Sequence, residues 1–223
     1  MTFLEILKNS ISWNDIYKKL AELSINNERL AGKLFEEFCK YYYLNEPSVC
    51  SDYQNVWLFD EIPHQVKKKL NLGTIDHGID LVLEGREGDF SVVQCKFKTN
   101  QNRTISWTKD RLANLFADGD KADYFIVFTN ASGIDKHSLT KKVNQLKLIT
   151  IGDLLGVMPS TLDAIKRQIS DKKKTTVIVK KPRDYQKLAI KDVLSGFKHN
   201  DRGQLILPCG AGKTLVSLWI KES

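Results

Sequence analysis

The sequence predicts an α/β fold: a mixed sheet flanked by helices, followed by the beginning of a second α/β unit. Short apolar runs rich in β-branched and aromatic residues, such as residues 124–129 and 146–151, predict buried strands. Segments with helical apolar spacing stand between these runs, and strands separated by helices are typical of α/β domains. A further apolar run at residues 203–207 leads into a glycine-rich loop, which predicts the second unit.

The first 45 residues predict helices. Apolar positions in residues 3–23 predict a short helix, a break and a second amphipathic helix, with Ser12 as the N-cap of the latter. A third helix is expected over residues 27–43, with Leu34, Phe35 and Phe38 toward the core. Residues 41–43 are three tyrosines that either pack at the core edge or stack on a nucleic-acid base.

Strands and helices then alternate along the chain. Strands are expected near residues 56–59 and over 79–84 and 90–98, the last two joined by a polar turn at 84–89. A loop and a helix follow over residues 103–117, and after two further strands a helical segment over 152–169 closes the domain. Its last helix is expected to start at Pro159 and Ser160.

Composition excludes several protein classes. The 223 residues are 42% hydrophobic and 27% charged, which fits a soluble globular protein. No apolar stretch approaches the roughly 20 residues that span a bilayer, and no signal peptide precedes the first helix, so we expect a cytoplasmic protein. The four cysteines show no Cys-x-x-Cys spacing, which disfavours a zinc site or a disulfide framework.

The net charge of +7 is concentrated late in the chain. Ten Lys or Arg residues lie between Lys166 and Lys191, against two aspartates. The run at residues 172–174 is either a solvated linker or a surface that follows phosphates. We therefore predict a first domain with N-terminal helices at 1–170, a basic linker at 171–181 and a truncated second domain at 182–223.

Three polar residues interrupt the central apolar strands. Asp80 opens one strand, and Gln94 and Lys96 lie two apart on the next, so they share a face while Cys95 takes the other. A carboxylate, an amide oxygen and an ammonium group together can hold a hard cation, orient water and offset charge on a phosphate. The alternative is three ordinary solvated residues at a sheet edge, which the buried character of the flanking strands disfavours.

The pattern Gly-Ile-Asp, thirteen residues, then Gln-x-Lys resembles the PD-(D/E)XK nucleases, specifically the Mrr-like branch that carries Gln for the usual acid. This resemblance implies a restriction-endonuclease-like sheet and a Mg²⁺-dependent DNA endonuclease. It further implies that Asp80 and Gln94 are metal ligands and that Lys96 positions or activates the attacking water. An acid of the first long helix often completes the site, and Glu36 matches better than Glu37.

Residues 208–214, Pro-Cys-Gly-Ala-Gly-Lys-Thr, lie between a predicted strand and a predicted helix. Such a loop cradles phosphates with backbone amides, while the Lys reaches the β and γ phosphates and the Thr ligates magnesium. Leu207 stands at the position where the full phosphate-loop motif has its first glycine. With this difference the motif resembles that of superfamily 2 helicases, and the resemblance implies a RecA-like motor that binds ATP. The implied nucleotide-binding residues are Gly210, Gly212, Lys213 and Thr214, with Gln186 reading adenine.

A nuclease followed by a motor resembles the N-terminus of the type ISP restriction-modification enzymes. The resemblance implies that the chain acts on double-stranded DNA, as part of a larger translocase polypeptide, with a possible second copy for double-strand cleavage. Two other functions stay open at this point. The first domain could be a DNA-binding accessory domain of a helicase with no nuclease activity, or a module that docks a partner onto the motor.

Overall fold

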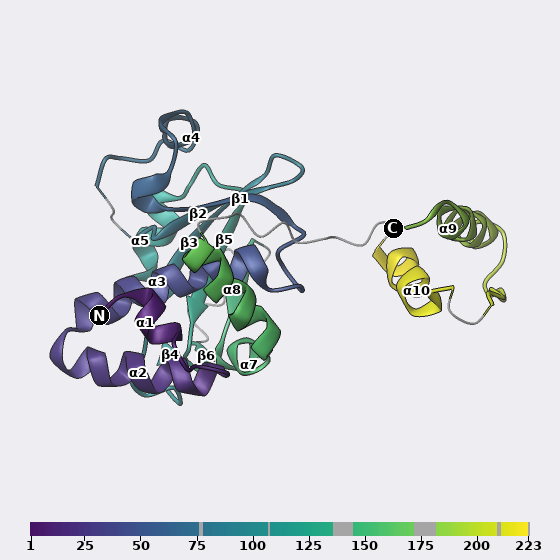
Figure 1. Ribbon diagram of the computed structural model, residues 1–223. Coiled ribbons are helices and arrows are strands. Elements are labelled where there is room, and N and C mark those ends of the chain that lie inside the picture. Colours follow the sequence, from purple (N-terminus) through teal and green to yellow (C-terminus); the bar gives the residue numbers. More distant parts are fainter. Residues whose placement is uncertain (76–77, 107, 136–144, 172–181, 209–210, 223) are drawn as a thin grey trace. The chain divides into compact units, whose positions relative to one another are not determined.

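The computed structural model describes residues 1–75, 78–106, 108–135, 145–171, 182–208 and 211–222. The chain divides into two compact units, Met1–Val177 and Ile178–Ser223, which are described separately (Figure 1). The predicted basic linker at 171–181, and with it the lysine run at 172–174, lies almost entirely outside the described residues.

The first unit contains a five-stranded mixed sheet with helices on both faces, as the sequence predicted (Figure 1). Its helical elements are α1 (Phe3–Leu7), α2 (Trp13–Asn26), α3 (Glu28–Asn45), η1 (Phe59–Glu61), α4 (His64–Lys69), α5 (Leu112–Asp118), α7 (Ile151–Leu155) and α8 (Pro159–Asp171). Its strands are β1 (Tyr53–Leu58), β2 (Leu81–Gly85), β3 (Phe90–Lys96), β4 (Thr104–Ile105), β5 (Tyr124–Thr129), β6 (Gly133–Ile134) and β7 (Leu146–Ile149).

Local sequence signals account for the helix boundaries. The Ser12 hydroxyl accepts a hydrogen bond from the Asp15 amide at 3.4 Å, and the Asp15 carboxylate accepts one from the Ser12 amide at 3.1 Å. This reciprocal pair satisfies amides that the first helical turn leaves unpaired. The N-cap predicted at Ser12 is therefore confirmed, as is the start of α8 at Pro159.

The order of strands in the main sheet is β1-β2-β3-β5-β7. β1, β2 and β3 pair antiparallel, whereas β3, β5 and β7 pair parallel. β3 therefore lies where the two halves of the sheet meet. Both of its faces are buried, and its residues from Phe90 to Cys95 are at most 9% exposed.

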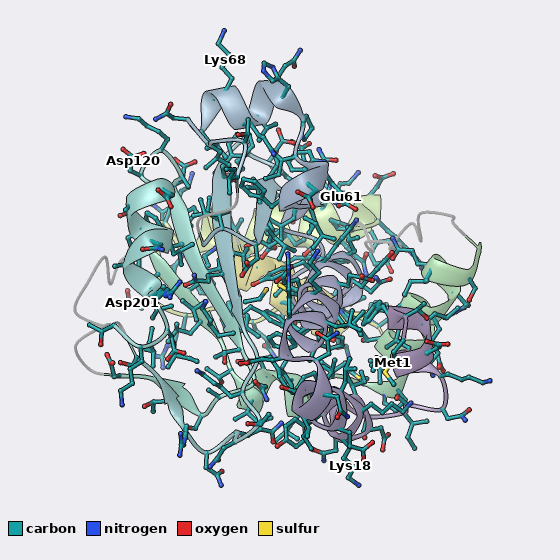
Figure 2. The ribbon with its side chains drawn as sticks, turned by 90° about the vertical axis from the view of Figure 1, so that its left-hand side faces the viewer. Met1, Lys18, Glu61, Lys68, Asp120 and Asp201 are labelled. Carbon is teal, nitrogen blue, oxygen red and sulfur yellow. The ribbon has the colours of Figure 1, made fainter. Side chains whose placement is uncertain are left out.

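Apolar layers cover both faces of the sheet. On one face, Phe35 and Phe38 of α3 pack against Phe128 of β5, with ring centroids 5.3 and 6.3 Å apart. On the other, Leu112 and Leu115 of α5 join a cluster with inward residues of β2, β3 and β5. Figure 2 shows α5 and the pair α2–α3 on opposite sides of the strands. Burial of this apolar area is the main driving force for the fold.

Some elements were not predicted. η1 and α4 follow β1, and α4 is a six-residue helix with no buried residue. β4 and β6 contain two residues each and pair parallel in a separate small sheet. Elements this short carry too little periodicity to be recognised in a sequence. Tyr42 and Tyr43 are 3% exposed and pack in the core, so base stacking by these two tyrosines was a wrong alternative.

The described part of the second unit contains two packed helices, α9 (Asp184–Gly196) and α10 (Lys213–Glu222). The strand predicted at 203–207 is not present: residues 203–206 are exposed and form no strand. A strand needs a neighbour to supply its backbone hydrogen bonds, and the described part of this unit contains none. In the described residues of the chain, no helix is long and apolar enough to cross a membrane.

Candidate active site

Asp80 lies immediately before β2, between the end of β1 and the end of β3. Its amide donates to Val93 O at 2.8 Å, and its carbonyl accepts from the Phe59 amide at 2.9 Å. Its side chain reaches further, because Asp80 Oδ2 accepts a hydrogen bond from the Cys95 amide at 2.5 Å. The carboxylate is thus fixed beside the last residues of β3, where the predicted partners lie.

Gln94 is buried in the sheet with one polar atom unsatisfied. The residue is 2% exposed, and its Oε1 has no hydrogen-bond partner in the described structure. A buried amide oxygen without a partner is costly, and in a native fold it calls for a ligand or a function. An amide oxygen is also among the ligands that hard divalent cations prefer. An Asp carboxylate and a Gln amide oxygen are thus both oxygen ligands of the kind that Mg²⁺ takes.

Gly78 makes room for the Gln94 amide. Its φ of +129° is unfavourable for residues with a side chain, and a Cβ there would lie 3.0 Å from Gln94 Nε2 and 3.1 Å from Asn114 Cβ. A glycine in the Gly-Ile-Asp pattern is thus required by both backbone conformation and space.

Lys96 ends β3 and is half-buried. It pairs in register with Thr129, the last residue of β5, whose hydroxyl donates to Lys96 O at 2.6 Å. Beyond the end of β3, the Asn130 side chain forms the hydrogen bonds that a neighbouring strand would otherwise supply. Its Oδ1 accepts from the Lys98 amide and its Nδ2 donates to Lys98 O, both at 2.7 Å. These two residues hold the backbone that carries Lys96.

Cys95 points to the opposite face from Gln94, as the alternation predicts, and packs in the α3 cluster with Cys39. Burial raises the pKa of the Cys39 thiol and raises that of the Cys95 thiol well above its usual value. The negative charges of Asp80 and Glu36 add to the rise of both pKa values. Asp80 and Glu36 therefore lie near the same pair of thiols.

The two glutamates of α3 have different surroundings. Glu36 lies on the side of the Cys39–Cys95 pair, whereas Glu37 lies near Lys40 and Glu61. Burial raises the pKa of Glu37; the Lys40 charge opposes the rise and the Glu61 charge adds to it. Glu36 is thus the acid on the Asp80 side, although it approaches from the face of the sheet opposite to Gln94. Helical spacing alone cannot distinguish these neighbours.

Within the described residues, no group of three or more His, Cys, Asp or Glu side chains could hold a metal ion. The donor pair here is one carboxylate and one amide, with Glu36 on the other face. A site this sparse is compatible with Mg²⁺, which keeps several waters and takes further oxygens from a phosphate substrate.

A cleft of about 1200 Å³ opens beside Lys96. It lies between the junction of α2 and α3 and the chain that continues β3 toward β4. This cleft was not predicted. Thr129 and Asn130, which we call the clamp because they hold the backbone at Lys96 and Lys98, were not predicted either. The usable signal was a pair of polar residues at the end of a strand that neighbours the Gln-x-Lys strand.

The nucleotide-binding residues predicted in the second unit are only partly described. Gly210 lies outside the described residues, and so does the side chain of Thr214. Gly212 has a φ of +77°, and Lys213 is the exposed first residue of α10. Gln186 is 5% exposed; its Oε1 accepts from the Arg183 amide at 2.8 Å, and its Nε2 donates to Ala211 O at 2.9 Å. Its amide thus joins the start of α9 to the predicted phosphate loop.

Family models match both parts of the chain. A model described as a restriction endonuclease, of the Mrr catalytic type, matches residues 44–174. A second model, described as the res subunit of type III restriction enzymes, matches residues 179–222. The second match is the start of a helicase-type motor, so the order of the two parts is the one that the sequence motifs predicted.

Among solved structures, the chain is similar to the "ATP-dependent Type ISP restriction-modification enzyme LlaBIII bound to DNA", with 29% sequence identity and a TM-score of 0.52. The match covers 96% of this chain and 13% of that one. A protein of unknown function, AF1548, matches over 71% of this chain and 92% of its own, with 18% identity and a TM-score of 0.29, too loosely to carry an argument. No curated protein matches the chain.

Proposed function

Because the chain belongs to the Mrr-type restriction endonuclease family, we propose that its first unit is a Mg²⁺-dependent DNA endonuclease domain. The observation that carries the proposal is the buried, unpartnered Oε1 of Gln94, two residues before Lys96 on a strand whose Cys95 amide binds Asp80. A buried amide oxygen without a partner destabilises the sheet unless a ligand satisfies it.

Each residue has a distinct role in this proposal. Asp80 and Gln94 would hold Mg²⁺, which supplies Lewis-acid polarisation of the scissile phosphate. Lys96 orients the attacking water and offsets the negative charge that develops on the phosphate. Glu36 would add a negative charge near Asp80, from the face of the sheet opposite to Gln94.

The substrate in this proposal is double-stranded DNA. In support, the similar type ISP enzyme is described as bound to DNA. Because this chain spans only 13% of that enzyme, we further propose that it works as the N-terminal part of a larger, ATP-dependent, DNA-translocating restriction-modification polypeptide. Breaking both strands would then take a second copy on the same DNA.

The competing proposal is a helicase accessory domain that binds DNA without cutting it. Intact Asp80, Gln94 and Lys96 favour the nuclease, because a binding domain gains nothing from an unsatisfied amide buried at 2% exposure. The two proposals differ in what the mutations below do to cleavage.

In the full-length parent protein, Asp80→Ala and Lys96→Ala should each lower cleavage of plasmid DNA at least on the order of a hundredfold. The reason is that both side chains act on the metal, the water or the phosphate. Gel assays of nicking and linearisation in Mg²⁺, with circular dichroism to verify folding, measure this. Wild-type cleavage by either folded variant would refute the catalytic assignment.

Glu36 and Glu37 form a matched pair for a second prediction. Glu36→Gln should lower the cleavage rate about tenfold, because it removes a charge close to the Asp80 side of the site. Glu37→Gln removes the same charge from the neighbouring position, near Lys40 and Glu61, and should leave the rate unchanged. Equal rates for the two variants would exclude Glu36 from the site.

The 223-residue chain should not hydrolyse ATP by itself, because phosphate cradling alone leaves the attacking water unpositioned and the transition-state charge only partly offset. In the full-length parent, Lys213→Ala should abolish both ATP hydrolysis and any cleavage that depends on translocation. Phosphate release, measured with DNA and Mg²⁺ present, tests both statements. Turnover by the 223-residue chain above that of its own Lys213→Ala variant would contradict the first.

A further inference from the structure

The cleft beside Lys96 is lined mainly by polar and charged side chains. It starts at the end of β3 and follows the chain from Phe97 to Thr104, with Ser106, Lys109 and Asp110 opposite the α2–α3 junction. Phe97 is the one aromatic residue among its described lining residues, and its ring packs on Phe35 at 5.5 Å and Tyr17 at 6.1 Å. The cleft thus offers hydrogen-bonding groups and charge, and no described ring free to stack on a base.

Two of its four basic residues are exposed and available. Lys98 forms an ion pair with Asp110, whose other carboxylate oxygen accepts from the Ser106 amide at 2.7 Å. That pair neutralises the Lys98 charge. Arg103 and Lys109 are exposed, and neither forms an ion pair with any described residue. An exposed cation with no acidic partner gains most when it meets an anion from outside.

The backbone that carries these groups is held rigidly. Asn130 fixes both polar backbone groups of Lys98, and Arg103 O accepts from the Ser132 amide at 3.2 Å. The next residues form β4, which pairs with β6. A surface positioned this way binds with little loss of conformational entropy. Exposed hydroxyl and amide side chains at Thr99, Asn100 and Asn102 add neutral donors of the kind that bind phosphate oxygens.

We propose that this cleft holds the sugar–phosphate backbone of the cleaved DNA strand beside the scissile phosphate, with Arg103 and Lys109 each bound to a phosphate. The proposal rests on the nuclease function, because it takes Lys96 as the end of the cleft at which cleavage occurs. The proposal also confines the DNA contact of the first unit to this cleft. Basic residues elsewhere on the unit, such as Lys68 of α4, contribute little. Figure 1 shows α4 at the opposite end of the unit from β4 and α2.

The test compares two double variants of the 223-residue chain that lose the same charge. Arg103→Ala/Lys109→Ala removes the cleft cations, whereas Lys68→Ala/Lys69→Ala removes two exposed lysines of α4, at the far end of the unit (Figure 2, where Lys68 is labelled). Fluorescence anisotropy with a labelled duplex, without Mg²⁺ and over a series of salt concentrations, gives affinity and salt slope. The cleft variant should lose about two units of log–log slope and at least about tenfold in affinity.

The control variant should lose less than half as much log–log salt slope as the cleft variant. Equal losses in both variants would mean that DNA is held by net charge alone, and an unchanged cleft variant would mean that it binds elsewhere; either overturns the proposal. Because binding is measured without Mg²⁺, it is separate from catalysis. If wild-type parent protein fails to cleave but the cleft variant alone loses affinity, the nuclease proposal fails and the DNA cleft stands.

A second inference rests on the hydrogen bonds around Lys96. Thr129 is 1% exposed, and besides donating to Lys96 O its hydroxyl accepts from the Ala131 amide at 3.0 Å. Asn130 is fully buried. The ladder of β3 ends at Lys96, where a strand would otherwise fray. We infer that Thr129 and Asn130 are positioning residues, which hold the end of β3 so that the Lys96 ammonium stays over the reacting phosphate.

Thr129→Val and Thr129→Ser test this inference as a matched pair in the full-length parent. Val keeps the shape of Thr but removes the hydroxyl, and Ser keeps the hydroxyl. Per folded molecule, Val should lower the cleavage rate constant about tenfold to a hundredfold with DNA affinity unchanged, and Ser should restore most of it. Hydrogen exchange over residues 94–98 should be faster in Val alone.

A purely structural role would give a lower melting temperature with a normal rate constant per folded molecule, and that result would overturn the inference. So would slow cleavage by both variants, because the hydroxyl would then not be the group that matters. If the parent protein does not cleave DNA at all, the proposed function fails, and hydrogen exchange still reports whether the Thr129 hydroxyl holds this backbone.

Discussion

The candidate site depends on the position of β3 between an antiparallel and a parallel neighbour. Because β2 runs against β3, the start of β2 lies beside the end of β3, and this brings Asp80 to the Cys95 amide. Because β5 runs with β3, the end of β5 lies there too, and this brings Thr129 to Lys96. A sheet of one orientation would place one of these two groups at the opposite edge.

This arrangement requires a polar group inside a close-packed sheet. Gln94 is 2% exposed between apolar neighbours on β3, where an unsatisfied amide oxygen lowers stability by roughly 1–3 kcal/mol. The surrounding fold tolerates this because both faces of the sheet are covered by continuous apolar clusters. The positive φ of Gly78, which glycine adopts without a steric penalty, leaves the space that the Gln94 amide occupies.

The sequence predicts the features of the candidate site that depend on strand alternation, but not those that depend on contacts between distant segments. The shared face of Gln94 and Lys96, with Cys95 on the other, follows from the period of a strand. The choice between Glu36 and Glu37 does not follow from helical spacing, since it depends on which charged groups surround each carboxylate in the folded chain. The Thr129–Asn130 clamp joins residues more than 30 positions apart, so only strand pairing reveals it.

The strand predicted at residues 203–207 is a second case in which local sequence does not decide the structure. Its apolar pattern is a correct local signal, yet the segment is exposed and Ile206 is 80% exposed, because local propensity cannot supply a neighbouring strand. Gln186 and Ala211 nevertheless meet without any sheet, through a hydrogen bond between a side chain and a loop carbonyl. By contrast, Asp80, Gln94 and Lys96 all lie within the first unit, whose sheet and both apolar clusters are complete around them. In the proposed function, the three residues that act on the metal, the water and the phosphate therefore belong to one compact unit.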